Sequence, residues 1–178
     1  MARKRQNKDS QQDLRALSFH EAGHAVMAYL KRQSFLGVSI ERDSDSEGHV
    51  MFRPLPPGWE YDLDDRNVRR RARARAACSL AGPHAEAVLT ESEVELDLRS
   101  SDVRDAWHLL EQIGDGSEAG SLLAGLLLHT QHQFRRPGVW AATGALASLL
   151  RRRRTMSAKE ARQVIRQAMD ETDQRDVT

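Results

Sequence analysis

Cysteine is nearly absent from this sequence of 178 residues, because Cys78 is the only one. A single cysteine excludes a disulfide within the chain and a cysteine-rich metal site built by one copy. Long apolar runs are missing as well. The longest one, Leu122 to Leu128, is interrupted by Ala124 and Gly125, whereas a helix that spans a bilayer needs about 20 apolar residues. The sequence therefore predicts a protein without a membrane span.

The N-terminal segment lacks the pattern of a secretion signal. Residues 1–12 are basic and polar, but Asp13 and Arg15 follow where a signal peptide would have its apolar region. A phosphate-binding sequence of the form GxxxxGKS or GxxxxGKT is missing too, so we expect no ATPase and no bound nucleotide. Together these absences predict a soluble, cytoplasmic protein.

An excess of charge of one sign is also missing. The chain has 27 Lys and Arg against 26 Asp and Glu, and the net charge of +1 gives no general reason to expect nucleic acid or an anionic membrane as a partner. Arginines do cluster locally, at Arg66, Arg69, Arg70, Arg71, Arg73 and Arg75, and at residues 151–154. We interpret them as solvated helix faces or as partners of the acid-rich stretch 86–105, because no aromatic residues alternate with them to stack on bases.

The length of the chain and its 39% of hydrophobic residues suit one domain with its own core. The periodic apolar patterns lie within residues 13–170, which we expect to form that domain. Residues 1–12 are predicted to be a polar, disordered arm, and residues 171–178 a frayed tail.

Apolar periodicity divides the domain into helices and one pair of strands. Helical spacing predicts helices over residues 13–32, 62–89, 102–113, 117–134, 139–154 and 158–170. β-Branched and aromatic residues predict strands over residues 35–41 and 48–53, with a polar turn over 42–47 between them and a proline-rich loop after them. The expected fold is mainly α, with a small antiparallel β-sheet near the N-terminus.

The strongest local signal is the HExxH pattern from His20 to His24 on the first predicted helix. Positions i and i+4 lie about 40° apart on a helix, so the two imidazoles could share one tetrahedral Zn²⁺. Glu21 lies about 100° from His20, where it could act as a base on a zinc-bound water. Gly23 in mid-helix costs about 1 kcal/mol relative to alanine, which indicates that something packs closely against it. The alternative is a pair of histidines that only pack in the core.

A catalytic zinc usually has three protein ligands and one open position. The third ligand must come from later in the chain, and residue types alone do not choose among the candidates, which are His49, His84, Glu86, Asp97, Asp102, Asp105 and His108.

The phrase HEAGHAV is similar to the zinc motif of the FtsH peptidase family, the proteolytic module of a membrane-bound AAA protease. Other phrases resemble that family in the same order between about residues 14 and 170, namely VSIERDSDSEGHVMFRPLP, SLAGPHAEAVL, SSDVRDAWHLL and LASLLRRRRTMSAKEARQVI. The resemblance implies that Asp102, which matches the aspartate of the family's SxDL segment, is the third zinc ligand. It also implies that Glu86 lies near the site and could orient His20 or His24.

The sequence departs from this family in ways that concern access to substrate. The family's ATPase motor and its transmembrane anchor have no counterpart here. Ala87 stands where the family has a second acid, Pro83 stands where it has an arginine, and residues 118–134 match poorly.

These residues predict a stand-alone zinc metalloendopeptidase that hydrolyses peptide bonds in unfolded or short polypeptides. His20, His24 and Asp102 would hold Zn²⁺, and Glu21 would be the general base. Two alternatives share the motif, a zinc-binding adaptor or regulatory module without significant proteolysis and a metallohydrolase for a non-protein amide. A homo-oligomer or a separate ATPase partner remains open.

The predicted strands suggest how a substrate would bind. An extended peptide can add to the unpaired edge of a sheet, so we expect either Val38–Glu41 or Val50–Arg53 to be the edge beside the zinc. Backbone pairing does not require a particular sequence, so the specificity should be loose.

Overall fold

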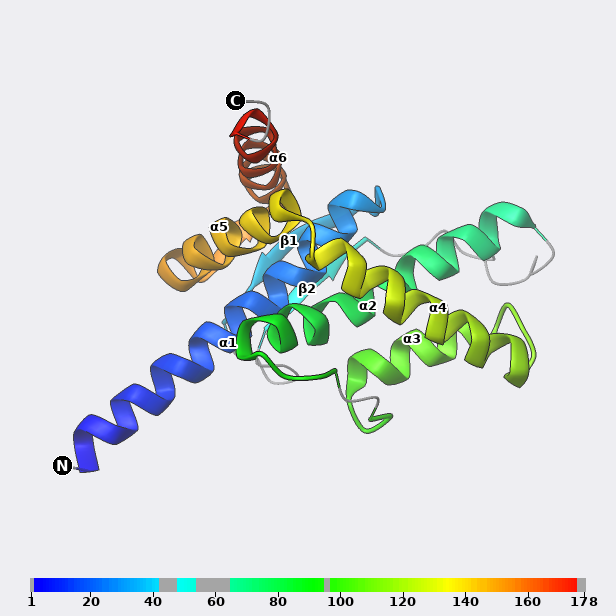
Figure 1. Cartoon of the computed structure of the whole chain (residues 1–178), viewed down its shortest axis with the longest axis horizontal. Coiled ribbons are helices and arrows are strands. Elements are labelled where there is room, and N and C mark those ends of the chain that lie inside the picture. The colour runs from blue at the N-terminus through cyan, green and yellow to red at the C-terminus, as the bar shows by residue number, and fades with distance from the viewer. Residues whose placement is uncertain (1, 42–47, 54–64, 95–96, 176–178) are drawn as a thin grey trace.

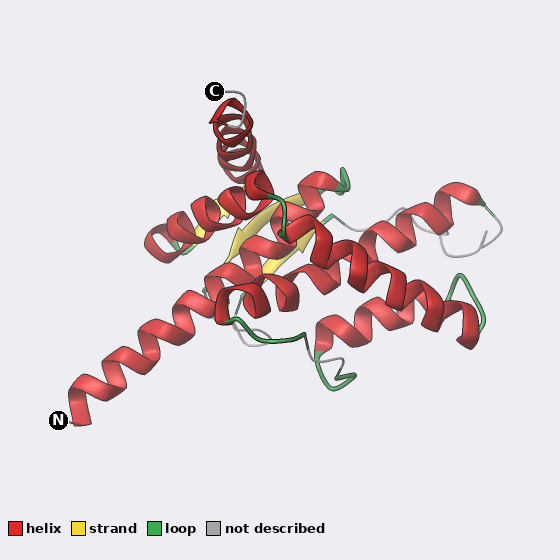
Figure 2. Cartoon of the chain, in the orientation of Figure 1, coloured by secondary structure: helices red, strands yellow, loops and turns green. Residues whose placement is uncertain are grey.

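Helices form most of this protein, and a small antiparallel sheet accompanies them, as the sequence predicts (Figure 2). The structure, a computed structural model, describes residues 2–41, 48–53, 65–94 and 97–175. Within these ranges the helices are α1 (Ala2–Leu30), α2 (Arg66–Thr90), α3 (Ser101–Glu111), α4 (Gly116–Phe134), α5 (Pro137–Arg153) and α6 (Ala158–Arg175). The strands are β1 (Phe35–Ser39), β2 (His49–Phe52) and β3 (Thr155–Ser157). None of the described helices is both long and apolar enough to cross a bilayer.

The sheet has the order β2-β1-β3, and both pairings are antiparallel. Val38 at the centre of β1 pairs with Val50 of β2 on one side and with Met156 of β3 on the other. The sequence analysis predicts β1 and β2 but misses β3, because three residues are too few to show an alternating pattern. The predicted polar turn over 42–47 and the proline-rich loop over 54–64 lie outside the described residues.

Two helices extend beyond their predicted ends. Helix α1 begins at Ala2 rather than at Asp13 and continues through the segment expected to be a disordered arm, and its first turns project from the rest of the molecule (Figure 1). Helix α6 continues to Arg175, into the expected frayed tail. Its start is fixed as predicted, since the Glu160 backbone N–H donates to Ser157 Oγ and the Ser157 N–H donates to Glu160 Oε2.

Helix α1 is the central element of the core. Its residues 21–28 are all buried, and it packs against α2 on one side and α5 on the other. The larger apolar cluster joins α1 to α2, the sheet, α5 and α6, through residues such as Met27, Ala81, Val38, Leu146 and Ile165. The smaller one joins α2 to α3 and α4. Helix α2 therefore links the two clusters, and it does so as one continuous helix with Pro83 inside it.

Gly23 is a point of close approach between α1 and α2. A Cβ atom at Gly23 would lie 2.6 Å from the Ala81 carbonyl oxygen and 2.6 Å from Ala85 Cβ. Any side chain there would meet the backbone of α2, which cannot move aside without shifting the helix. The close packing predicted from a mid-helix glycine is therefore present, and it brings the HExxH turn of α1 directly against α2.

We expect Gly23→Ala to destabilise the fold although alanine is the better helix former. Overpacking costs about 1–3 kcal/mol, which outweighs the gain of about 1 kcal/mol in helix propensity. Urea unfolding followed by circular dichroism measures the difference. The control is Gly144→Ala in α5, where an added Cβ would have no neighbour within 4 Å and stability should stay the same or rise. Equal stability of the two variants would contradict the close contact.

Candidate metal centre

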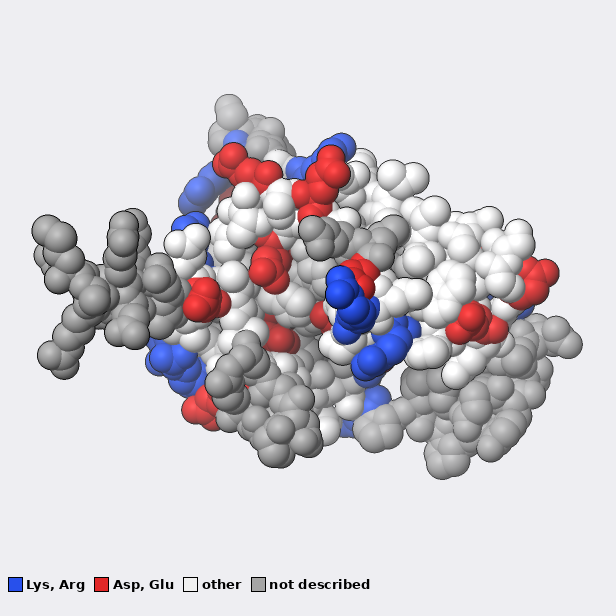
Figure 3. All heavy atoms as spheres, turned by 90° about the horizontal axis from the view of Figure 1, so that it is seen from below, with Lys and Arg blue, Asp and Glu red and all other residues white. Residues whose placement is uncertain are grey.

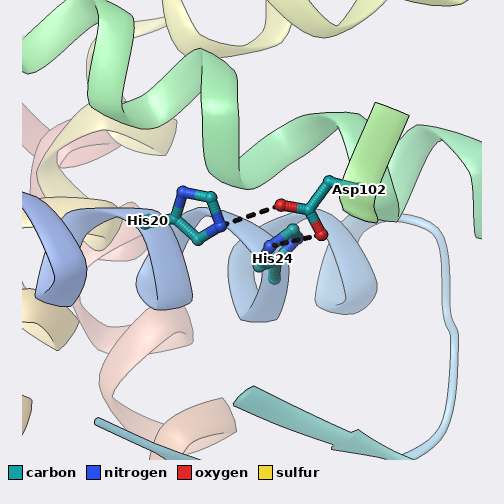
Figure 4. A group of neighbouring side chains, drawn as sticks. All are labelled: His20, His24 and Asp102. Atoms are coloured by element: carbon teal, nitrogen blue, oxygen red, sulfur yellow. Dashed lines mark hydrogen bonds and ion pairs between the residues drawn. The ribbon is translucent and has the colours of Figure 1, made fainter. Parts of the chain in front are cut away.

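Three side chains from two helices converge beside α2. His20 and His24 lie one turn apart on α1, and Asp102 reaches them from the first turn of α3 (Figure 4). His20 Nε2 lies 3.0 Å from Asp102 Oδ2, and His24 Nε2 lies 3.5 Å from Asp102 Oδ1. The two oxygens of one carboxylate thus face the two imidazoles.

Each imidazole is held in place by a second contact on its far side. The Nδ1–H of His24 donates to the backbone carbonyl of Cys78 over 2.7 Å, and His20 Nδ1 lies 3.2 Å from Glu86 Oε2. A carbonyl can only accept, so His24 Nδ1 carries a proton, and Nε2 is the nitrogen that faces Asp102 and could ligate a metal. This arrangement, with the outer nitrogen bound to an oxygen, is the usual one for histidines that ligate metals.

The spacing of the three side chains fits a small divalent cation. Metal–ligand bonds of about 2.0–2.2 Å put the ligand atoms of a tetrahedral zinc about 3.3 Å apart. One ligand atom from each of His20, His24 and Asp102 can be chosen so that all lie within 4.8 Å of one another. The cluster could therefore hold a metal ion, and its nitrogen and oxygen donors would suit zinc but also other divalent transition metals.

Gly82 of α2 leaves room in front of the two imidazoles. A Cβ atom at Gly82 would lie 2.6 Å from His20 Nε2 and still closer to His24 Nε2. It would thus take a position close to the one a metal bound to both nitrogens would occupy. The missing side chain at Gly82 is what keeps this space open.

The charges of the cluster support one another. Burial alone would lower the pKa of His20, but hydrogen bonds with Asp102 and Glu86 raise it to about 10. Burial would likewise raise the pKa of Asp102, and its hydrogen bonds with His20 and His24 lower it well below its usual value. In the absence of a metal, His20 therefore carries a proton at neutral pH, which a metal would have to displace.

Glu21 lies beside the cluster but is not part of it. Only 4% of the residue is exposed, and its Oε2 has no hydrogen-bond partner among the described residues. Burial raises the pKa of the Glu21 carboxyl, against the opposing effect of His24 and His20. A Cβ at Gly48, the residue before β2, would lie 3.1 Å from Glu21 Oε1, so this carboxyl sits between the imidazoles and the start of β2.

The structure brings together the residues that the sequence analysis and the resemblance select, and it separates most of the other candidates from them. Glu86 contacts His20 through the nitrogen that faces away from Asp102, so it can orient that ring but does not share the cluster's centre. His49 lies near Glu21 and acts on its charge. The remaining candidates lie apart or have other partners: His84 (the Leu80 carbonyl), Asp97 (Arg99), His108 (Glu111) and Asp105, which is exposed.

The sequence analysis misses two contributors to the site, the Cys78 carbonyl and Gly82. The Cys78 carbonyl gives no sequence signal, because every residue has a carbonyl. Gly82 does give one, since a glycine in mid-helix costs about 1 kcal/mol and needs a structural reason, as for Gly23.

No protein-family model and no curated protein matches this sequence.

We expect Gly82→Ala to abolish metal binding without removing a ligand, because the new methyl group would fill the space in front of His20 and His24. Calorimetric titration of the metal-free protein with zinc should show about one site per chain in the wild type and none in the variant. Gly144→Ala is the control, with wild-type binding expected. Normal zinc affinity in Gly82→Ala would mean that the metal does not bind between these imidazoles.

Removing Asp102 and removing Glu86 should have different effects. Asp102→Ala deletes a ligand and should abolish tight zinc binding, whereas Glu86→Ala deletes a contact behind His20 and should weaken binding by about 10–100-fold. Zinc content after dialysis, together with titration, separates the two. Full zinc in Asp102→Ala with loss in Glu86→Ala would reverse the two assignments.

Proposed function

We propose that this protein is a zinc-dependent metalloendopeptidase of the FtsH type that hydrolyses peptide bonds in unfolded or short polypeptides. One observation carries the proposal. A buried carboxyl with an unbonded oxygen, Glu21, lies close enough to two imidazoles for their charge to act on it, and the Nε2 atoms of these imidazoles converge with the Asp102 carboxylate. A cluster that served only to stabilise the fold would have no need of a buried, unsatisfied carboxylate, which costs about 1–3 kcal/mol or more.

The residues divide the work as follows. His20, His24 and Asp102 would hold Zn²⁺, which when bound supplies Lewis acidity and lowers the pKa of a neighbouring water. Glu21 accepts a proton from the water that attacks the peptide carbonyl carbon. As the C–N bond breaks, Glu21 returns that proton to the leaving amine. A pKa raised by burial suits a group that must both take and give a proton near neutral pH.

Glu86 and the Cys78 carbonyl act through the two histidines. Each binds the outer nitrogen of one ring, so the ring cannot turn its Nε2 away from the metal position. The carboxylate behind His20 also makes that imidazole a stronger donor. These contacts are positioning contacts, and they do not touch the substrate.

Of the two expected edge strands, β2 fits the role of substrate platform. Strand β1 has neighbours on both sides, whereas no described strand pairs with the outer side of β2. Strand β2 also starts next to Glu21. An extended peptide that adds to β2 would therefore pass the general base, and its backbone would be held without a demand for particular side chains.

The sequence carries no P-loop, so the expected substrates are chains that are already unfolded or that a separate ATPase partner delivers. Exposing a buried bond in a stable domain costs about 5–15 kcal/mol, which binding to one strand would not supply.

Glu21→Gln is the test of this mechanism. Glutamine keeps the size of the side chain but cannot accept the proton, so zinc should stay bound while hydrolysis of a casein-like unfolded protein falls at least about 100-fold. Glu111→Gln, an exposed residue of α3, is the control and should cleave normally. A stable folded domain should remain intact with either protein.

Two results would contradict the proposal. Equal cleavage by Glu21→Gln and wild type would remove Glu21 from the mechanism. A wild type that binds zinc but cleaves no unfolded chain would favour the adaptor or regulatory module instead.

A further inference from the structure

Two adjoining cavities at the C-terminal end of α1 are lined, as far as the described residues go, by basic side chains and by no acidic one. The first, of about 840 Å³, lies between α1, α2 and α4 and is lined by Lys31, Arg32, Arg66, Arg69, Arg70 and Arg73 among others. The second, of about 720 Å³, adds Arg53 and Arg162. The two share Leu30 and Arg32. We call them together the basic groove.

The arginines reach the groove because of their helical spacing. Arg66, Arg70 and Arg73 follow one another by four and three residues, so they lie on one face of α2, while Val68 and Ala72 are buried on another. Like charges at this spacing repel one another, which disfavours the arrangement unless something compensates it. Arg69 has a carboxylate partner, Glu118 of α4, which lies outside the acid-rich stretch 86–105.

The other groove arginines have no such partner in the described ranges. No ion pair joins Arg66, Arg70 or Arg73 to a described carboxylate, and Arg70 bonds only to the side-chain amide of Asn67. On the face shown in Figure 3, by contrast, basic and acidic side chains are interspersed. The described residues thus make the groove a local concentration of positive charge on a chain whose net charge is only +1.

Strand β2 connects this groove to Glu21. Gly48, just before β2, is next to Glu21, and Arg53, just after it, lines the groove. The Arg53 N–H donates to the Ser34 carbonyl over 3.0 Å, which extends the pairing of the two strands. Five residues of strand span about 16 Å. An extended chain lying along β2 would therefore reach from the general base to the groove.

We propose that the basic groove binds an acidic segment of the polypeptide substrate and so selects which unfolded chains are cleaved. This inference rests on the proposed peptidase function. Antiparallel pairing is the more frequent kind, and a substrate antiparallel to β2 runs from the Phe52 end towards Glu21. Its acidic residues would then lie about five residues N-terminal to the cleaved bond, where carboxylates can accept hydrogen bonds from the guanidinium groups.

A polypeptide fits the groove better than a nucleic acid does. Two of the described residues that line the groove are aromatic: Tyr29, which is half-buried, and Phe35, which is buried beneath the Arg162 guanidinium at 4.8 Å. Neither offers an exposed face on which bases could stack. Continuity with β2 favours an extended peptide, because the strand supplies backbone partners that a nucleic acid cannot use.

The binding test uses zinc-loaded Glu21→Gln protein, so that peptides are not consumed. Three fluorescent twelve-residue peptides share one uncharged sequence and carry four glutamates at the N-terminal end, at the C-terminal end, or none. Fluorescence anisotropy should show about tenfold tighter binding of the N-terminally acidic peptide, and the difference should shrink as salt is raised. A short single-stranded oligonucleotide with about four phosphates, which matches the charge of the four glutamates, is the fourth probe.

Arg66→Gln/Arg73→Gln should abolish this preference, and both residues are exposed, so the fold should be unaffected. Arg151→Gln/Arg152→Gln removes two exposed charges at the end of α5 and is the matched control, with the preference retained. In the cleavage-competent background, the groove variant should raise KM about tenfold for the acidic peptide alone, with kcat unchanged. Arg53→Gln should act in the same direction.

The outcomes separate this inference from the proposed function. Equal affinity for acidic and uncharged peptides, or equal effects of the two double variants, would overturn it even if unfolded chains are cleaved. Preference for the C-terminally acidic peptide would overturn the assigned direction, and tighter binding of the oligonucleotide would overturn the polypeptide assignment. A third result is possible: no chain is cleaved, but Glu21→Gln protein prefers the acidic peptide and Arg66→Gln/Arg73→Gln abolishes that preference. This result would overturn the proposed hydrolysis and support the binding of acidic segments in the basic groove.

Discussion

The contact between the backbones of α1 and α2 is the constraint on which the site depends. Because Gly23 has no side chain, α1 approaches α2 until its Cα lies against the carbonyl of Ala81. Only at this distance can His24 reach the Cys78 carbonyl and His20 reach Glu86. Helix α3 packs against another face of α2 and delivers Asp102. The two mid-helix glycines thus have different roles. Gly23 sets the distance between α1 and α2, and Gly82 leaves the space in front of the imidazoles open.

The electrostatics of the site follow from that geometry. Asp102 and Glu86 flank His20 and raise its pKa, while Glu21, which has no hydrogen bond at Oε2 among the described residues, has its own pKa raised by burial. Protonated His20 stabilises the fold fully below its usual pKa of about 6.5, and this contribution is lost as the pH rises towards about 10. Ionised Asp102, whose pKa is lowered, contributes its full stabilisation of the fold above pH 3.8, and this contribution is lost on acidification. A proton on His20 therefore supplies positive charge opposite Asp102, as a metal would, and the proton and the metal compete for this site.

Sequence reasoning reaches the parts of this structure that local periodicity encodes. Helical spacing predicts that His20 and His24 share a face, and a costly mid-helix glycine predicts tight packing at Gly23. Residue chemistry alone leaves seven candidates for the third position, because the approach of α3 depends on packing across α2, and the resemblance to a known family singles out Asp102. Strand β3 is missed because its three residues form a strand only through pairing with β1. The hydrogen-bond partner of His24 is missed because it is a backbone carbonyl, which every residue has.

The same rigid elements that build the metal centre also fix its distance from the basic groove. Helix α1 carries His24, and Lys31, which directly follows the end of α1, lies in the groove wall seven residues later, a separation of about 10 Å along the helix axis. Strand β2 spans the gap on the substrate side, from Glu21 to Arg53. Lys31 itself is anchored, because its Nζ donates to His129 Nε2 of α4 over 2.6 Å. In a substrate bound at both ends, the length of β2 would therefore fix the distance between the acidic segment and the cleaved bond. Backbone pairing on β2 would tolerate any sequence near the cleaved bond, while selectivity would come from charge some five residues away.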